Sequence, residues 1–356
     1  MPAGPVSAII EPAMSVGYVY HPIYFEHDTG QHVEAAARLN AIVSHLEQTG
    51  LKSQLTLIEP RPASVAEIAL VHQKGYIKEI EEKAAKGGGW LDPDTVMSAD
   101  SYQAALYAAG GVIRAVETVM GGEVASAFAL VRPPGHHATS GQAMGFCLFN
   151  NIAVAAEYAL EKYKLERVLI IDFDVHHGNG TQQAFYDNPH VMYLSTHEYP
   201  FYPGTGSLEE TGAGAAKGTT INIPMPAGCG DSEYLAVFEQ IIVPAAQRFK
   251  PRLILVSTGY DGHWADPLAM MQVSVSGFAR MAGVIKSLAD ELCGGRLALT
   301  LEGGYNLDAL AASVKATFDV LLGNAIDDPL GGPPRRFESP NIERLMAAVK
   351  EIQGLG

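Results

Sequence analysis

The stretch Val168–Thr181 (VLIIDFDVHHGNGT) constrains the fold of this chain more than any other. Its first four residues are apolar without alternation, which is typical of a strand buried on both faces of a parallel sheet. If the extended geometry continues, Asp172, Asp174 and His176 lie on one side of the backbone, because successive side chains of a strand point to opposite faces. Two carboxylates and an imidazole can be buried together only when they are paired or bind a metal ion. The stretch therefore predicts either a metal site or a hydrogen-bonded strand end.

Strand-like and helix-like segments alternate along the chain. Further apolar runs of strand length lie at residues 16–20, 125–131, 191–195, 220–223, 253–257 and 296–301. Segments of helical spacing, including those at 233–249 and 307–322, separate or follow most of these runs. This alternation predicts a single-domain α/β fold over residues 1–356, with a central parallel sheet and helices on both faces. We place the core at about residues 16–325, a linker rich in proline and glycine at 326–340, and a C-terminal docking helix at 341–353.

Charge and cysteine content narrow the class of protein. The net charge of −15 argues against direct binding of nucleic acid, because such binding neutralises phosphates with Lys and Arg. The three cysteines form no CxxC pair, which favours a reducing compartment. The sequence contains no recognisable signal peptide and no apolar run of about 18 residues. We therefore expect a cytoplasmic protein with no membrane partner, and we leave a homo-oligomer open.

Polar clusters directly follow five of the apolar runs, after Val131, Ile171, Leu194, Ser257 and Leu301. In open α/β sheets the ligand site lies beyond the carboxyl ends of the strands. We therefore expect the clusters to converge on one crevice.

The residue types in these clusters indicate metal-assisted hydrolysis of an amide. Two ligands from the opening stretch and a third from the loop 261–266 would leave a fourth position open, as in catalytic zinc sites. Because no thiolate is present, Fe(II), Co(II) and Mn(II) also suit these donors. The adjacent His136 and His137 would act as an acid/base pair, and the phenol of Tyr305 would stabilise an oxyanion.

Each of these residues also has a structural interpretation when it is taken alone. Asp266 could cap a helix before Pro267, a single histidine after a strand is commonly structural, and Gly-Gly-Tyr is an ordinary turn sequence. Their convergence favours the chemical interpretation.

Six segments together resemble one known family. They are RPPGHH, GFCLFNN, IDFDVHHGNGT, YPGTG, GYDGHWADP and LEGGYN, and their order and spacing are similar to those of the histone deacetylase / acetylpolyamine amidohydrolase family. The resemblance covers about Tyr18 to Leu322. It implies the arginase/deacetylase α/β fold and zinc-dependent removal of an acetyl group from an amine.

The resemblance also implies roles for individual residues. The implied catalytic set is His136, His137, Asp172, Asn179 and Tyr305, and the implied zinc ligands are Asp174, His176 and Asp266. In this assignment His137 is the general base, Asp172 orients His136, and Tyr305 polarises the acyl carbonyl. Fe(II) or Co(II) could replace zinc. The implied substrate-binding residues are Asp94, Gly145, Phe146, Tyr202, Leu268 and Gly304. A structural potassium ion would use Asp172, Asp174, His176, Ser195 and Thr196, largely through backbone carbonyls.

Three features distinguish this chain within the family pattern. Asn179 stands where some branches carry a second aspartate. The neutral amide of this asparagine keeps His137 neutral near pH 7. Its presence also resembles the class II-like, bacterial-type amidohydrolases. The early HPExPxRL-type segment is degraded to His32–Leu39, with both prolines lost, which leaves the geometry of the pocket rim open. Leu268 stands where polyamine-selective relatives have a glutamate.

We therefore expect a metal-dependent deacetylase of acetyl-lysine in peptides or proteins, or of small acylated amines. The alternatives are an acetylpolyamine amidohydrolase, an arginase-like ureohydrolase with two manganese ions, and a non-catalytic acyl-amine or acetoin-pathway binding protein on the same fold. The ureohydrolase would need more bridging carboxylates than the sequence offers, and the binding protein would usually have lost one of the site residues.

Overall fold

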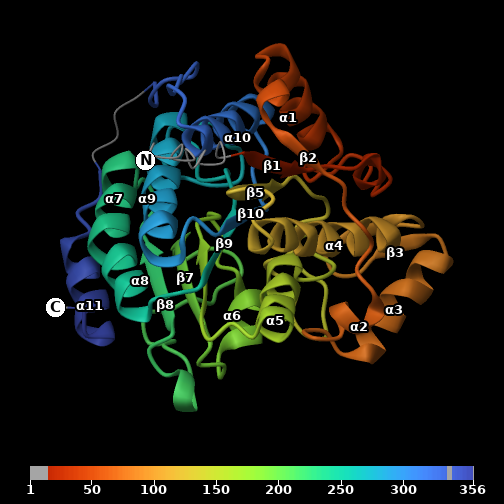
Figure 1. The fold of residues 1–356 in the computed structure, drawn as a ribbon, viewed down its shortest axis with the longest axis horizontal. Helices are drawn as coiled ribbons and strands as arrows, with labels where there is room; N and C mark the ends of the chain where they lie inside the picture. Colours follow the sequence, from red (N-terminus) through yellow and green to blue (C-terminus); the bar gives the residue numbers. More distant parts are fainter. Residues whose placement is uncertain (1–14, 335–338, 356) are drawn as a thin grey trace, which may run out of the picture.

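The computed structural model describes residues 15–334 and 339–355, and its centre is an eight-stranded sheet (Figure 1). All neighbouring strands pair in parallel, in the order β2-β1-β5-β10-β9-β6-β7-β8. The strands are β1 (Val16–Val19), β2 (Thr56–Ile58), β5 (Ser126–Ala129), β6 (Val168–Asp172), β7 (Val191–Glu198), β8 (Thr220–Met225), β9 (Leu253–Thr258) and β10 (Leu297–Leu301). A separate antiparallel hairpin joins β3 (Gly88–Trp90) to β4 (Val96–Ser98).

Two layers of helices cover the sheet, one on each face (Figure 1). One layer holds α1 (Ala37–Gln48), α7 (Asp231–Val237), α8 (Val243–Phe249), α9 (Val275–Cys293) and α10 (Leu307–Leu322). The other holds α2 (Val65–Ile68), α3 (Lys74–Ala85), α4 (Ser101–Met120), α5 (Asn151–Tyr163) and α6 (Asn179–Phe185). This architecture confirms the predicted α/β fold with a central parallel sheet and helices on both faces.

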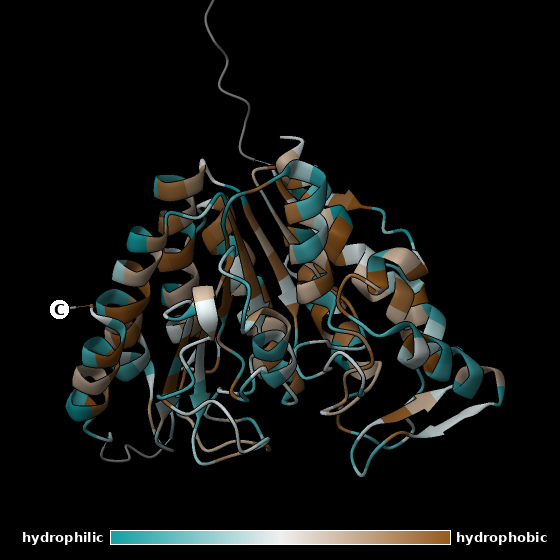
Figure 2. Ribbon diagram, turned by 90° about the horizontal axis from the view of Figure 1, so that it is seen from below, coloured by the Kyte–Doolittle hydropathy of each residue, from teal (hydrophilic) through white to brown (hydrophobic). Residues whose placement is uncertain are grey.

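Burial on both faces explains why the strands are so apolar. Every residue of β6 is completely buried, including Asp172 at its carboxyl end. Figure 2 shows the same pattern, with hydrophobic strands inside and hydrophilic positions on the outer helix faces. Parallel sheets need this double cover because their crossover helices pack on both faces.

Most predicted elements appear within a few residues of their expected bounds, and three differences are instructive. β6 ends at Asp172, so Asp174 and His176 lie in a loop and not on an extended strand. The predicted helix 233–249 is divided by a π-helical turn at Phe238–Ile242. The β3–β4 hairpin was not predicted, because its strands are short and one of them begins with two of three consecutive glycines.

The C-terminal helix α11 (Glu343–Gln353) lies beside the outer strand β8. The side-chain amide of Gln353 donates a hydrogen bond to the carbonyl of Thr220 at 3.1 Å, which fixes the end of this helix to the sheet. The assignment of 326–340 as a linker stays a prediction, since residues 335–338 lie outside the described residues.

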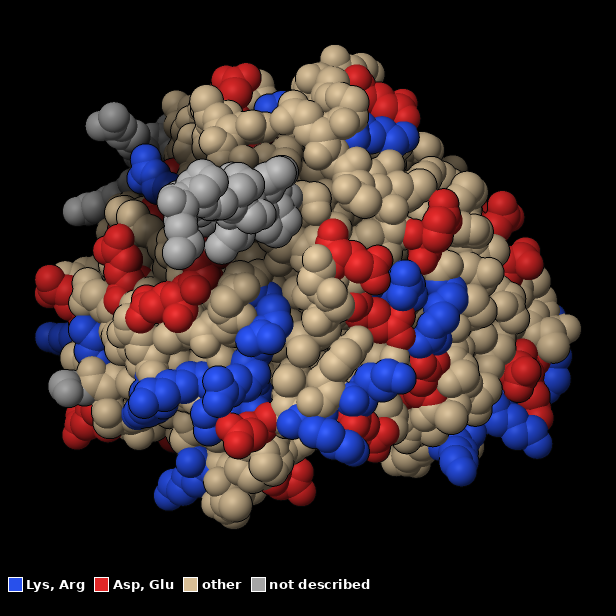
Figure 3. All heavy atoms as spheres, in the orientation of Figure 1, with Lys and Arg blue, Asp and Glu red and all other residues tan. Residues whose placement is uncertain are grey.

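Two surface properties bear on the expected partners. None of the helices in the described part of the chain combines the length and the apolar character that a bilayer crossing would need. On the face shown in Figure 3, Lys and Arg side chains are interspersed with Asp and Glu. No uninterrupted basic surface is seen on this face, in keeping with the net charge of −15.

A buried ion network connects the segment before α1 to the loop after β5. Glu34 accepts hydrogen bonds from Arg132 Nε at 2.5 Å and Arg132 Nη2 at 2.7 Å, and from Arg38 Nη1 at 3.3 Å. All three side chains are completely buried. Burial alone would raise the pKa of Glu34, but the charge and hydrogen bonds of Arg132 hold that pKa well below its ordinary value.

We expect Glu34→Gln to lower the free energy of unfolding by about 3–5 kcal/mol, because it leaves two buried guanidinium groups without their shared carboxylate. Chemical denaturation of the purified protein measures this loss. Glu47→Gln is the matched control, since Glu47 forms an exposed ion pair with Lys52 that is worth about 1 kcal/mol or less. Equal, small losses in both variants would contradict the structural importance of the network.

Candidate active site

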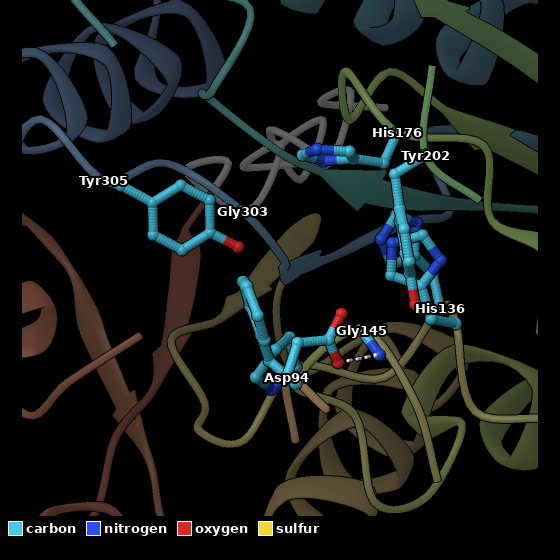
Figure 4. Close-up of a pocket in the computed structure, with 10 residues that line it drawn as sticks. Asp94, His136, Gly145, His176, Tyr202, Gly303 and Tyr305 are labelled. Atoms are coloured by element: carbon cyan, nitrogen blue, oxygen red, sulfur yellow. Dashed lines mark hydrogen bonds between the residues drawn. The ribbon is translucent and has the colours of Figure 1, made fainter. Parts of the chain in front are cut away.

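A narrow pocket of about 70 Å³ opens at the carboxyl edge of the sheet (Figure 4). The five strands that the sequence analysis linked to polar clusters, β5, β10, β9, β6 and β7, are contiguous in the sheet. Their loops therefore meet over one short stretch of its edge. The pocket is lined by Asp94, Pro134, His136, His137, Gly145, Phe146, His176, Tyr202, Gly303 and Tyr305.

The two adjacent histidines have different partners. His136 Nδ1 lies 3.1 Å from Asp172 Oδ2, whereas His137 Nδ1 lies 2.8 Å from the side-chain oxygen of Asn179. Burial opposes a charge on His136, but the carboxylates of Asp174 and Asp172 outweigh it and raise the pKa of His136 to about 10. Burial and the neighbouring charges of His136 and His176 lower the pKa of His137 well below its ordinary value. One imidazole is therefore suited to carry a proton near pH 7 and the other to accept one.

Asp172 is itself held by a residue that the sequence analysis missed. The hydroxyl of Tyr193 donates a hydrogen bond to Asp172 Oδ2 at 3.0 Å, and the backbone N–H of Asp174 donates to Oδ1 at 3.2 Å. The only sequence signal for Tyr193 is a single hydroxyl within the otherwise apolar residues 191–194 at the start of β7. With these bonds, Asp172 is fixed as the partner of His136.

A second cluster has the donor atoms of a metal site. Ligand atoms of Asp174, His176 and Asp261 lie within 4.8 Å of one another, and all three residues are buried. His176 Nδ1 is 3.2 Å from both Asp174 Oδ1 and Asp261 Oδ2. A side chain at Gly303 would collide with both carboxylates, so glycine leaves them the space they occupy. Oxygen and imidazole donors of this kind fit Zn(II) and similar divalent ions.

Asp266, the third ligand implied by the resemblance, lies next to this cluster but makes other contacts. Its Oδ2 accepts the backbone N–H groups of Tyr305 at 2.7 Å and Asn306 at 3.1 Å, and its Oδ1 accepts that of Leu268 at 3.0 Å. Burial and the negative charge of Asp261 raise the pKa of Asp266 to about 7. Two carboxylates of one loop are thus candidates for the third position, and the sequence analysis named only Asp266.

Tyr305 faces the pocket (Figure 4). The ring of Phe146 meets the ring of Tyr305 edge-on, and Arg38 lies over the tyrosine ring. The guanidinium carbon of Arg38 lies 5.0 Å from the centre of the tyrosine ring. Arg38 Nε donates to the carbonyl of Gly304 at 2.7 Å, and Nη2 donates to that of Glu302 at 2.5 Å. Sequence reasoning gave Arg38 no role, because its partners lie more than 260 residues away.

The predicted substrate-binding residues are only partly brought together. Asp94, Gly145, Phe146 and Tyr202 line the pocket, and Asp94 Oδ1 accepts the N–H of Gly145 at 3.2 Å. Gly145 has φ 55°, and a side chain there would collide with the ring of His137. Leu268 and Gly304 are not among the lining residues.

The residues predicted for potassium lie around the end of β6. Asp172 ends β6, Asp174 and His176 follow in the loop, and Ser195 and Thr196 lie within the neighbouring strand β7. Asp172 and Ser195 are paired in the β6–β7 register, and Ser195 Oγ lies 2.9 Å from His197 Nδ1. The hydroxyl of Thr196 is buried without a hydrogen-bond partner. This placement suits the predicted use of their backbone carbonyls, which stays a prediction.

Another buried carboxylate, that of Glu302, was also missed. Its Oε2 accepts the N–H groups of Gly135 at 2.7 Å and His136 at 3.2 Å, and its Oε1 accepts the hydroxyl of Ser257 at 3.1 Å. Burial raises the pKa of Glu302 to about 7. The site therefore combines donors for a divalent ion, a neutral and a charged imidazole, and a phenol around one narrow pocket.

Comparisons with known proteins agree with this chemistry. Residues 32–321 match the histone deacetylase domain. The chain is 45% identical over 349 residues to "Histone deacetylase 10, chloroplastic" of Oryza sativa subsp. japonica, covering 92% of this chain and 79% of that protein. It is 40% identical to a "Probable deacetylase" of Archaeoglobus fulgidus, covering 83% and 82%.

The fold has a close counterpart among solved structures. The crystal structure of the HDA15 HD domain superposes with a TM-score of 0.86 and 34% sequence identity, covering 96% of this chain and 94% of that one. The family match, the sequence relatives and the superposition agree over nearly the whole chain. The chain belongs to the histone deacetylase family, whose members are hydrolases that act on amide bonds.

Proposed function

We propose that this enzyme is a zinc-dependent deacetylase acting on acetyl-lysine side chains of peptides or proteins, or on similar acylated amines. The observation that carries the proposal is one narrow pocket lined by the two unequal imidazoles, by the phenol of Tyr305 and by His176 of the metal-competent cluster. Figure 4 shows His136, His176 and Tyr305 around this pocket. A pocket of about 70 Å³ suits a slender acyl-alkylamine chain.

The side chains divide the work of hydrolysis. A divalent ion held by Asp174, His176 and a third aspartate would supply Lewis acidity to the acyl carbonyl and the attacking water. The neutral His137 accepts the proton of the water as its oxygen bonds to the acyl carbon. Tyr305 donates a hydrogen bond to the resulting oxyanion. As the C–N bond breaks, a protonated imidazole of the pair gives its proton to the amine, so that acetate and a free amine leave.

The substrate class follows from the pocket wall and the neighbouring loop. Phe146 and Tyr202 present aromatic rings to the pocket. Leu268 brings no charge to the loop after Asp266, so nothing at that position would favour the internal ammonium of a polyamine. We therefore propose acetyl-lysine over acetylpolyamines, with a structural potassium ion at the ends of β6 and β7.

We expect the zinc-loaded enzyme to hydrolyse acetyl-lysine peptides with a higher kcat/KM than acetylspermidine, because Leu268 offers no carboxylate to a second amine where polyamine-selective relatives have a glutamate. Tyr305→Phe is the matched control and should lower kcat by about 10²–10³-fold, the usual cost of losing one oxyanion donor. A chromatographic assay of released acetate measures both. Preference for acetylspermidine would establish the polyamine reaction instead, and near-complete activity of Tyr305→Phe would remove its assigned role.

We expect Asp261→Asn to lower the zinc content of the purified enzyme, because a ligand atom of Asp261 lies with those of Asp174 and His176, whereas both oxygens of Asp266 already accept backbone N–H groups. Elemental analysis after dialysis against a weak chelator measures the loss. Asp290→Asn, an exposed helical position, is the control. If Asp266→Asn releases the ion and Asp261→Asn retains it, the third ligand is Asp266, as the family resemblance implies.

We expect Asn179→Asp to move the acid limb of the pH profile of kcat/KM to higher pH, by about one unit or more. A carboxylate at this position raises the pKa of His137, so the base becomes protonated, and activity falls, at a higher pH than in the wild type. Asn341→Asp makes the same charge change at the exposed start of α11 and should leave the profile unchanged. An unshifted profile in Asn179→Asp would contradict the role of His137 as the base.

A further inference from the structure

Glu302 takes no part in the steps above, yet its carboxylate lies directly behind the two histidines. It follows β10 and is completely buried. One oxygen receives the backbone N–H groups of Gly135 and His136, and the other receives the hydroxyl of Ser257 in the neighbouring strand β9. A fully desolvated carboxylate costs several kcal/mol unless hydrogen bonds or charges compensate for it.

The charge of His136 and the peptide backbone provide this compensation. Burial raises the pKa of Glu302, and the nearby charge of His136 and the hydrogen bond from Gly135 partly offset this rise. Among the described residues, Glu302 forms no ion pair with a lysine or arginine, and Arg38 reaches only its backbone carbonyl. One carboxylate oxygen accepts the N–H groups of two consecutive peptide units, Pro134–Gly135 and Gly135–His136, and so defines the orientation of both.

Other contacts fix the same loop from the opposite side. The side-chain amide of Asn151 donates to the carbonyl of Pro133 at 3.0 Å, and the backbone N–H of Thr181 donates to the carbonyl of His136 at 3.1 Å. A side chain at Gly135 would come within 2.5 Å of the backbone nitrogen of Asn151, so the loop packs closely against α5. Glu302, which follows β10, contacts the same loop from the side of the sheet.

The segment that carries Glu302 also carries two other parts of the site. The N–H of Gly303 donates to Asp174 Oδ2 at 2.7 Å, and Tyr305 faces the pocket. Three residues of the segment 302–305 therefore contact the histidine loop, a metal-cluster aspartate and the substrate pocket. A displacement of Glu302 would change the distance between the imidazoles and the phenol.

We propose that Glu302 is a positioning residue, whose carboxylate holds the two consecutive peptide units from Pro134 to His136 and thereby sets His136 and His137 relative to Tyr305. The inference rests on the proposed function, since the geometry it sets is that of amide hydrolysis. Errors of about 1 Å in such geometry can cost about 10²-fold in rate.

Two substitutions test separately the length and the charge of the Glu302 side chain. Glu302→Gln removes the charge but keeps an oxygen that can accept both N–H groups, while the Ser257 hydroxyl can turn to accept from the amide. Glu302→Asp keeps the charge but is one methylene shorter, so it cannot reach the same N–H groups from the same backbone position. Ser257→Ala is the control, because it leaves both bonds to the histidine loop in place.

We expect Glu302→Asp to lower kcat by about 10²-fold with KM and zinc content close to the wild type, and Glu302→Gln and Ser257→Ala to retain most of kcat. Steady-state kinetics of the zinc-loaded enzyme on an acetyl-lysine peptide give the split between kcat and KM. The proposal is overturned if Glu302→Asp matches the wild type, or if Glu302→Gln loses as much as Glu302→Asp.

A second readout does not depend on turnover. In ¹⁵N-histidine NMR spectra of the zinc-loaded protein, the imidazole signals of His136 and His137 should shift in Glu302→Asp and stay in place in Glu302→Gln. If the wild type hydrolyses none of the acylated amines, the proposed function fails while the spectra still test the positioning role. Unchanged histidine signals in Glu302→Asp would overturn that role even in an active enzyme.

Discussion

An excess of buried negative charge at the carboxyl edge of the sheet is the constraint on which the site depends. Asp172, Asp174, Asp261 and Glu302 are all completely or almost completely buried there. Carboxylates in such surroundings must be neutralised, paired or given a cation. His136 supplies a positive charge beside Asp172, as its raised pKa of about 10 indicates. A divalent ion held by Asp174, Asp261 and a neutral His176 would offset the charge of the other two aspartates, so the electrostatics favour the proposed metal site.

The same charges give the two adjacent histidines different properties. His136 contacts an aspartate and His137 contacts an amide, although the two rings lie only 4.0 Å apart. Two like charges at this distance repel, so the carboxylate at His136 also disfavours a proton on His137. The charge of the partner side chain, a carboxylate at His136 and a neutral amide at His137, thus separates an acid from a base. Such divergent pKa values in a matched pair are typical of acid/base catalysis.

The sequence was most informative where a pattern is local. Apolar runs located the strands of the central sheet within a few residues except the short β2, and the helix predicted at 307–322 coincides with α10. Polar clusters after five runs identified residues that do meet, since His136, His176 and Tyr305 line one pocket. Helix α6, in contrast, begins at Asn179, where the glycines on either side predicted only a turn.

The residues that were missed act through distant partners. Tyr193, Arg38 and Glu302 lie within or beside ordinary apolar and helical segments, so no local pattern distinguishes them. Arg38 meets Gly304 across 266 positions of sequence, and Glu302 meets Gly135 across 167. Only the order of strands in the sheet, with β10 beside β5, brings such segments together.

These distant contacts form one continuous support behind the pocket. Arg38 holds the carbonyls of Glu302 and Gly304, and Glu302 in turn holds the loop of His136. Arg38 and Arg132 share the carboxylate of Glu34, and Arg132 lies at the start of the same histidine loop. These hydrogen bonds form a closed ring, so His137, the base, and Tyr305, the oxyanion donor, are fixed to the same set of buried side chains. The base and the oxyanion donor therefore depend on the same buried carboxylates, Glu34 and Glu302, although neither of these is among the residues that line the pocket.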